Sequence, residues 1–219
     1  LGIGKDGLAG YPLIDVYLTG KELKLAAEVD ASVSDFMTTA RLYCSGLNFT
    51  FNPNRMILNK VTDCYLTRED GERIEIQDDQ LYRVVTDLYT GQMLGSVMEM
   101  SYGLLKIEPK DKDGNPIENL ENQAIMEGDK ELKAWDAIAR YMKSFDDTDG
   151  NGISNVPEYY ETTHGRKVVD ESRNVIDLVK NPNKFSVMIV GIVLVLILII
   201  ILLVVLIRKL IKKRRRKKK

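Results

Sequence analysis

Two features that open many exported proteins are missing from the start of this sequence. The chain begins at Leu1 instead of a methionine, and no charged segment followed by a short apolar run stands near its N-terminus. A protein whose N-terminus lies outside the cytoplasm needs such a signal. We therefore expect this sequence to be the C-terminal part of a longer protein.

Cysteine is also scarce, because only Cys44 and Cys64 occur among the 219 residues. We predict a hairpin between them. In a register that places Asn52 opposite Met56, Cys44 lies opposite Cys64, and a cross-strand disulfide is then possible outside the cytoplasm. The alternative is a pair of half-buried thiols.

Charged residues are absent from the stretch 185–207, which reads FSVMIVGIVLVLILIIILLVVLI. A helix that crosses a bilayer needs roughly 20 apolar residues, and this run is long enough. A buried core helix is the alternative, but core helices rarely run so far without a polar residue. We predict one transmembrane helix over 185–207, preceded by a juxtamembrane linker over 171–184.

Basic residues gather in the tail 208–219, which holds ten of the 31 lysines and arginines. Because lysine and arginine beside a spanning helix stay on the cytoplasmic side, we expect a cytoplasmic tail and an extracytoplasmic N-terminal part at the cell membrane. That N-terminal part contains 32 acidic and 21 basic residues, so its net charge is near −11. Such a surface disfavours a nucleic acid polymer as a partner, whereas the tail is suited to anionic membrane lipid.

The beginning of the chain predicts a strand followed by a helix. Residues 11–18 read YPLIDVYL and carry the aromatic and β-branched residues typical of a strand. Thr19 and Glu22 then have the spacing of a capping box, which opens a helix. The apolar residues expected on its buried face recur at helical spacing: Leu23, Ala26 and Ala27.

Several further elements are predicted from apolar runs and turn residues. Strands are expected at 46–51, 57–66, 81–85 and 104–108, with a tight turn at Asp70-Gly71. Asp129 is expected to cap a helix over 130–145 whose Trp135 lies in the core, and Ser172 is expected to cap a last short helix.

Three runs resemble the C-terminal domain of the 5′-nucleotidase family: YPLIDVYLTGKELKLAAE, CSGLNFTFNPNR and LYRVVTDLYTG. The family pattern has a proline-led strand, a T/S-G-x-x-L helix, an S-G-L/I strand and a Y-x-V-V-T/A strand. All four occur here in this order, from residue 11 to about residue 108. The resemblance implies an α/β fold, with a mixed sheet and helices on its outer faces. It also implies a domain over 1–170 that binds the nucleoside part of a substrate.

The resemblance also implies where catalysis takes place. In the family it uses two divalent metal ions held by Asp, His and Asn ligands of a preceding N-terminal domain. Metal-assisted hydrolysis needs several such ligands, and His164 is the only histidine here. We therefore expect both metals in that other domain, and no activity from this chain alone. The chain would be the substrate-binding part of a cell-surface phosphoesterase that hydrolyses nucleotide phosphates. The alternative is a membrane-anchored stalk or interaction domain that has lost nucleotide binding.

Substrate-binding residues are implied at three positions. Relatives carry an aromatic residue shortly before the S-G-L strand, where Arg41 and Tyr43 stand here, and arginine also stacks on a base. A second aromatic follows the Y-x-V-V-T strand, and Tyr89 stands in that place. Relatives then have a Gly-Gly-Asp-Gly-aromatic loop. The residues from Gly91 to Gly95 depart from it and lack the aspartate, which favours the stalk.

The stretch 147–158 matches the calcium-loop pattern D-x-[DN]-x-[DN]-G-x5-E. Oxygen atoms at fixed positions of such a loop surround one calcium ion, whose role here would be structural. Ser154 and Pro157 are unusual for these loops, and a plain turn rich in Asp, Asn and Gly is the alternative. The predicted ligands are Asp147, Asp149, Asn151, Ile153 and Glu158.

Overall fold

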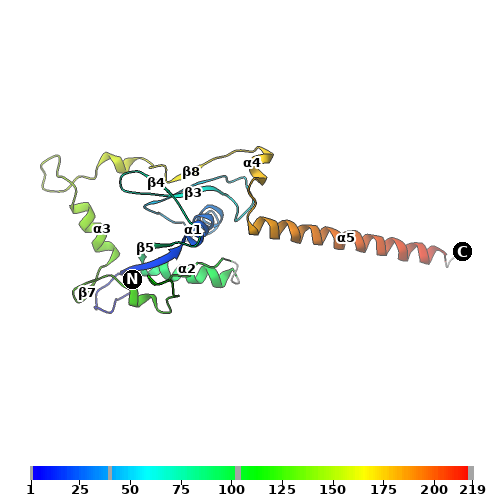
Figure 1. The fold of residues 1–219 in the computed structure, drawn as a ribbon, viewed down its shortest axis with the longest axis horizontal. Coiled ribbons are helices and arrows are strands. Elements are labelled where there is room, and N and C mark those ends of the chain that lie inside the picture. The colour runs from blue at the N-terminus through cyan, green and yellow to red at the C-terminus, as the bar shows by residue number, and fades with distance from the viewer. Residues whose placement is uncertain (1, 39–40, 102–104, 217–219) are drawn as a thin grey trace.

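The computed structural model describes residues 2–38, 41–101 and 105–216, and Figure 1 shows their arrangement. The first half contains five strands and two helices, and one long helix ends the described chain. In chain order the elements are β1 (Leu13–Thr19), α1 (Gly20–Val33), β2 (Leu47–Phe51), β3 (Val61–Thr67), β4 (Arg73–Glu75), β5 (Leu81–Asp87), α2 (Leu88–Met100), the 3-10 helix η2 (Leu120–Gln123), β6 (Met126–Glu127), β7 (Lys130–Glu131), α3 (Ala134–Lys143), the 3-10 helix η3 (Glu158–Glu161), β8 (Lys167–Val169), α4 (Val175–Val179) and α5 (Lys184–Arg216).

The strands of the described residues form three sheets. β1 pairs antiparallel with β5, from Leu13 opposite Asp87 to Thr19 opposite Leu81. The largest sheet has the order β4-β3-β2-β8 and is mixed, because β8 runs parallel to β2 while β3 runs antiparallel to both β2 and β4. β6 and β7 form a small antiparallel pair. The predicted α/β fold with a mixed sheet is confirmed.

Helix α1 is the centre of the core, because it packs against both β1 and β3 (Figure 1). On one side Ala26 packs with Leu18 and Ile107. On another side Ala27 packs against Phe49 of the mixed sheet. Small alanine side chains on both sides let the sheet and the β1–β5 pair approach the same helix. The predicted buried face of this helix is confirmed.

The long C-terminal helix α5 projects away from the rest of the chain (Figure 1). Its segment Lys184–Lys213 is long and apolar enough to cross a membrane, and no other helix of the described residues passes that test. The side chains from Val187 onward are largely exposed, whereas Phe185 and Ser186 are buried. The predicted apolar helix is therefore present, and it begins at Lys184.

The β2–β3 hairpin corrects the predicted register. Residues 57–60 stay outside the strand, and β3 begins only at Val61. Phe49 lies opposite Cys64, while Cys44 precedes β2. Both cysteines are free and half-buried, as in the thiol alternative. Burial raises the pKa of the Cys64 thiol to about 12.

Helix α3 is shorter than predicted. Asp129 does not cap it, because residues 130–131 form β7 and the helix begins at Ala134. Lys133 before it is buried, and its Nζ pairs with Glu131 at 2.6 Å and with Asp6 at 3.0 Å. This ion cluster ties the segment to the N-terminal loop and overrides the helical pattern. Trp135 is also not in the core, since its side chain is 58% exposed.

Two other predictions differ from the structure, and one helix was not predicted. The expected strand at 104–108 is not a strand over 105–108, and residue 104 lies outside the described residues. Helix α4 is capped by Asn174, whose side chain accepts a hydrogen bond from the Ile176 N–H, instead of by Ser172. Helix α2 was not predicted, because Gly91 and Gly95 lower the helical propensity of its sequence.

Candidate functional site

A pocket between α1, α2 and the loop before β2 brings two of the three predicted substrate-binding residues together. Arg41 and Tyr89 both line it, and its volume is about 80 Å³. Its other lining residues are mostly apolar and come from α1, α2 and two loops: Ala26, Val29, Met37, Leu42, Thr90, Met93, Leu94 and Ile107.

Tyr43, the third predicted residue, does not line this pocket. Its side chain is 87% exposed, so it does not belong to the core either. The ammonium of Lys167 lies 5.4 Å from the centre of its ring, a distance at which a cation and an aromatic face attract each other.

Tyr89 is held by the first turn of α2. Asp87 caps this turn, because its carboxylate accepts the Thr90 N–H at 3.0 Å and the Thr90 hydroxyl at 2.6 Å. The ring of Tyr89 lies 5.6 Å from the ring of Tyr11, centre to centre, at a tilt of 40°. One aromatic edge of the pocket is therefore fixed by a capped helix and by a ring from the N-terminal segment.

The residues from Gly91 to Gly95 form part of helix α2. A Cβ atom at Gly91 would lie 2.6 Å from Cδ1 of the buried Ile14, so the end of the Ile14 side chain would have to shift. Glycine at this position lets α2 pack directly against β1. The segment that the resemblance compares with a substrate loop thus has a clear role in packing.

The buried carboxylate of Asp30 anchors the loop that carries Arg41. Its Oδ1 accepts the Leu42 N–H at 3.0 Å, and its Oδ2 lies 2.5 Å from the Nζ of Lys167. Asp30 belongs to α1, so the core helix holds both the pocket loop and strand β8. The pair balances the Asp30 charge, which would otherwise be costly to bury.

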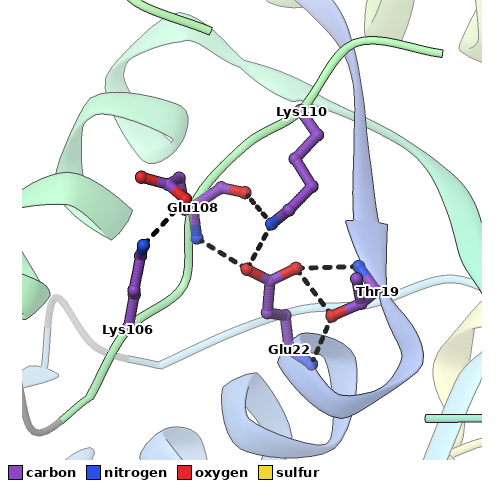
Figure 2. Close-up of polar contacts among 5 residues, drawn as sticks. All are labelled: Thr19, Glu22, Lys106, Glu108 and Lys110. Atoms are coloured by element: carbon purple, nitrogen blue, oxygen red, sulfur yellow. Dashed lines mark hydrogen bonds and ion pairs between the residues drawn. The ribbon is translucent and has the colours of Figure 1, made fainter. Parts of the chain in front are cut away.

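Glu22 holds the segment that forms another wall of the pocket (Figure 2). One carboxylate oxygen accepts the N–H of Thr19 at 2.8 Å and its hydroxyl at 2.7 Å, which confirms the predicted capping box. The other oxygen accepts the Glu108 N–H at 3.1 Å and the Lys110 ammonium at 2.6 Å. This network fixes the chain on either side of Glu108 against α1, so that the neighbouring Ile107 faces the pocket.

The same contacts shift the acidity of Glu22. Burial by itself would raise its pKa, but the Lys110 ammonium and the donors from Thr19 and Glu108 together hold the pKa below its ordinary value of 4.5. The carboxylate is therefore charged at neutral pH, and it acts as a clamp between α1 and the 105–110 segment.

The predicted calcium loop folds around the carboxylate of Asp147. This group accepts backbone N–H groups of Gly150 and Gly152, each at 2.8 Å, and of Asn151 at 3.2 Å. The Gly152 N–H is the largest cause of the lowered pKa of Asp147. Gly150 and Gly152 have φ angles of 72° and 85°, which favour glycine.

The other predicted calcium ligands are arranged as follows. The side-chain oxygen of Asn151 accepts the Ile153 N–H at 2.8 Å, and its amide donates to Asp149 at 2.9 Å. Glu158 is exposed in η3. Within the described ranges no group of three or more His, Cys, Asp or Glu side chains is placed to hold a metal ion. The calcium site therefore remains a prediction from the sequence.

His164 lies outside the pocket and beside a group of tyrosines. Its ring stacks on Tyr159 at 4.0 Å between centres, with an angle of 15° between the planes. The residues present do not fit the two-metal centre of the family, so no step of phosphoester hydrolysis is assigned to them.

Sequence reasoning missed the apolar walls of the pocket. Met37, Met93 and Leu94 line it next to the predicted residues. The signal for Met93 and Leu94 was the recurrence of apolar residues at helical spacing within 88–100, which the two glycines masked.

Residues 9–101 match the family described as 5′-nucleotidase, C-terminal domain. This segment includes every residue that lines the pocket except Ile107. This segment of the chain is thus similar to the C-terminal domain of the 5′-nucleotidase family.

Two solved structures are similar to this chain. A 5′-nucleotidase precursor from Thermus thermophilus shares 18% identity, with a TM-score of 0.45, and the match covers 74% of this chain and 26% of that one. An NAD nucleotidase from Haemophilus influenzae shares 19% identity, with a TM-score of 0.34, and the match covers 47% of this chain and 19% of that one. The chain thus spans about a quarter or less of these proteins. No curated protein matches it.

Proposed function

We propose that this chain is the substrate-recognition part of a 5′-nucleotidase-type phosphoesterase. The pocket between α1 and α2 would receive the nucleoside part of a nucleotide phosphate. The observation that supports this most is that Arg41 and Tyr89, chosen by resemblance, line one pocket inside the matching segment.

The chemistry of the pocket suits a flat, mostly apolar ligand. A tyrosine ring stacks on a base, and an arginine guanidinium stacks on a base or pairs with an anion. Apolar methionine and leucine side chains complete the walls. Two divalent metal ions and the attacking water would come from a preceding domain of the longer protein.

We further propose that α5 anchors the chain in the cell membrane. Lysine and arginine dominate the end of the helix and the tail, and such residues stay on the cytoplasmic side. The pocket would then lie on the extracytoplasmic side, and the tail would contact anionic lipid.

A binding titration tests the proposal on the full chain in detergent micelles. Adenosine and uridine are added while protein fluorescence and the melting temperature are followed. We expect saturable binding. Tyr89→Ala should weaken it about fivefold or more, because stacking of a base on an aromatic ring is worth about 1–3 kcal/mol.

Tyr43→Ala is the matched control, because it removes the same ring from an exposed place outside the pocket. It should leave nucleoside affinity unchanged. Equal losses in the two variants, or no binding by a folded wild-type chain, would contradict the proposed role of the pocket.

The second candidate function is a membrane-anchored stalk or interaction domain. The specific observation in its favour is size, since ligand pockets usually measure about 300–1,000 Å³ and this one measures about 80 Å³. The helical Gly91–Gly95 segment also leaves no substrate loop at that place. A folded chain without any nucleoside affinity would favour this alternative.

A further inference from the structure

The juxtamembrane residues 171–183 are held against the β2–β3 hairpin by a buried arginine. Arg55 follows the turn of the hairpin, and its side chain is almost entirely inaccessible. The guanidinium donates to the carbonyl of Asp177 at 2.5 Å and to that of Lys180 at 2.6 Å. A third donor group reaches the carbonyl of Asn59 at 2.7 Å. The middle of α4 and the residue that follows it are thus tied to the folded domain.

Three asparagines extend this attachment. Asn52 donates to the carbonyl of Ser172 at 2.8 Å, and Asn54 donates to that of Glu171 at 3.2 Å. Asn183 donates to the carbonyl of Leu58, and its side-chain oxygen caps the first turn of α5. The segment before the membrane helix is therefore fixed in place on the domain.

The start of α5 is fixed as well. Phe185 is buried in a cluster with Val29 and Leu105, and half-buried Leu58 packs against that cluster. Because Val29 belongs to α1, the membrane helix is connected to the central helix of the core. The domain and α5 consequently share one orientation.

Helix α4 presents an apolar surface that nothing in the described chain covers. The exposed fractions of its side chains are 71% for Val175, 69% for Ile176 and 64% for Val179. Figure 1 shows α4 beside the N-terminal end of α5. Exposed apolar groups gathered in this way mark a contact with a protein or a membrane.

We propose that α4 is a second membrane contact, through which the folded domain rests on the bilayer that α5 crosses. The partner is the interfacial region of a phospholipid bilayer, and this inference rests on the proposed anchoring by α5. Figure 1 shows α4 beside the first turns of α5, and the Arg55 contacts keep it at the start of the membrane helix.

The three basic residues around α4 fit the same partner. Arg173, Lys180 and Lys184 are exposed before, after and shortly beyond the helix. Lysine and arginine place their apolar stems along a membrane surface while their charges reach the headgroups. Lipid phosphate groups would therefore meet these three cations while Val175, Ile176 and Val179 enter the acyl boundary.

The test uses tryptophan as a reporter in the full chain, in a Trp135→Phe background. Ile176→Trp is placed in nanodiscs that contain lipids brominated near the headgroup, which quench tryptophan on contact. Ile153→Trp is the matched control, because Ile153 is also an isoleucine and is 71% exposed, but it lies in the distal loop after α3. Val179→Trp replaces the reporter if Ile176→Trp does not fold.

The expected result is a loss of emission and a blue shift for Ile176→Trp, with neither for Ile153→Trp. Leu196→Trp lies near the middle of the apolar part of α5. It reports insertion of the helix itself in a second set of nanodiscs, whose lipids are brominated near the ends of the acyl chains. Quenching at Leu196 without quenching at residue 176 would overturn the α4 contact and leave the anchor intact. No quenching at either position would contradict the membrane anchoring as well.

Discussion

Helices α1 and α3 carry similar apolar patterns but have opposite surroundings. Ten residues of α1 are buried, whereas none of α3 is, although both helices were predicted from apolar residues at helical spacing. Helix α1 has a sheet and a strand pair around it, while Trp135 and Ile138 of α3 point largely into solvent. The spacing of apolar residues therefore predicts a helix, and its neighbours in the fold decide whether the helix is buried.

The largest expected difference in stability is between substitutions of two aromatic residues, one that packs on α1 and one that belongs to α3. Phe49, which packs on α1, is 2% exposed, and Trp135 in α3 is 58% exposed. Phe49→Ala should lower the free energy of unfolding by about 3–5 kcal/mol. Trp135→Ala should cost about 1 kcal/mol, mainly through the lost hydrogen bond to Ala9.

Chemical denaturation of the full chain in micelles, followed by circular dichroism, measures both losses. Similar losses for the two variants would show that the apolar face of α3 is buried in solution. They would contradict the difference in burial between α1 and α3.

Removing the charge of a carboxylate should also cost more stability in α1 than in α3. Glu22→Gln leaves the half-buried Lys110 without its ion pair, and should cost about 3 kcal/mol. Asp136→Asn breaks an exposed pair with Arg140 at 2.6 Å, and should cost about 0.3–0.5 kcal/mol. Melting temperatures of the two variants, measured side by side, test this difference in stability cost. A fall at Asp136 as large as that at Glu22 would contradict the account.

Protonation of Glu22 in acid should cost no more stability than the Glu22→Gln substitution, because both changes remove the same negative charge beside Lys110. Glu22 has a lower pKa in the folded chain than its ordinary value of 4.5. The stability that it adds is therefore present above pH 4.5 and is lost as the pH falls through the folded-state pKa. The melting temperature should fall more steeply below pH 4.5 in the wild type than in Glu22→Gln. An identical pH dependence of the melting temperature in the two proteins would contradict the role of Glu22 as a clamp between α1 and the 105–110 segment.

Calcium should act on the region around α3 and leave the core unchanged. At about 10 mM calcium, a site with the roughly millimolar affinity of extracellular modules would add about 1.4 kcal/mol to the loop 147–158. Protection of this loop from a protease measures the effect, which Glu158→Gln should abolish. Asp113→Asn, in another acidic turn, should keep it. No protection by calcium in the wild type would favour the plain turn.

The first half of the fold was largely predictable from the sequence. The capping box at Thr19 and the strand–helix order depend on neighbouring residues, so local patterns were sufficient. The register of Cys64 and the start of α3 depend on contacts between distant segments. Lys133, for example, is buried by its pairing with Asp6, and no local pattern contains that information.

The candidate site was predicted only in part, for the same reason. Arg41 and Tyr89 came from a resemblance in sequence, and the structure brings them to one pocket. Ile107 reaches the pocket because Glu22 binds the neighbouring backbone. The role of Arg55 in holding α4 could not be predicted from the sequence either, since the carbonyl groups that it binds there lie more than 100 positions later in the chain.

Photolabelling with an azidoadenosine tests the central claim most directly, because it reports where a nucleoside binds. The full chain is irradiated with the probe in micelles, and the labelled peptides are identified by mass spectrometry. The account predicts labels in residues 37–42 or 88–94, which an excess of adenosine suppresses. Labels confined to the α3 region, or labels that adenosine does not suppress, would contradict a nucleoside pocket between α1 and α2.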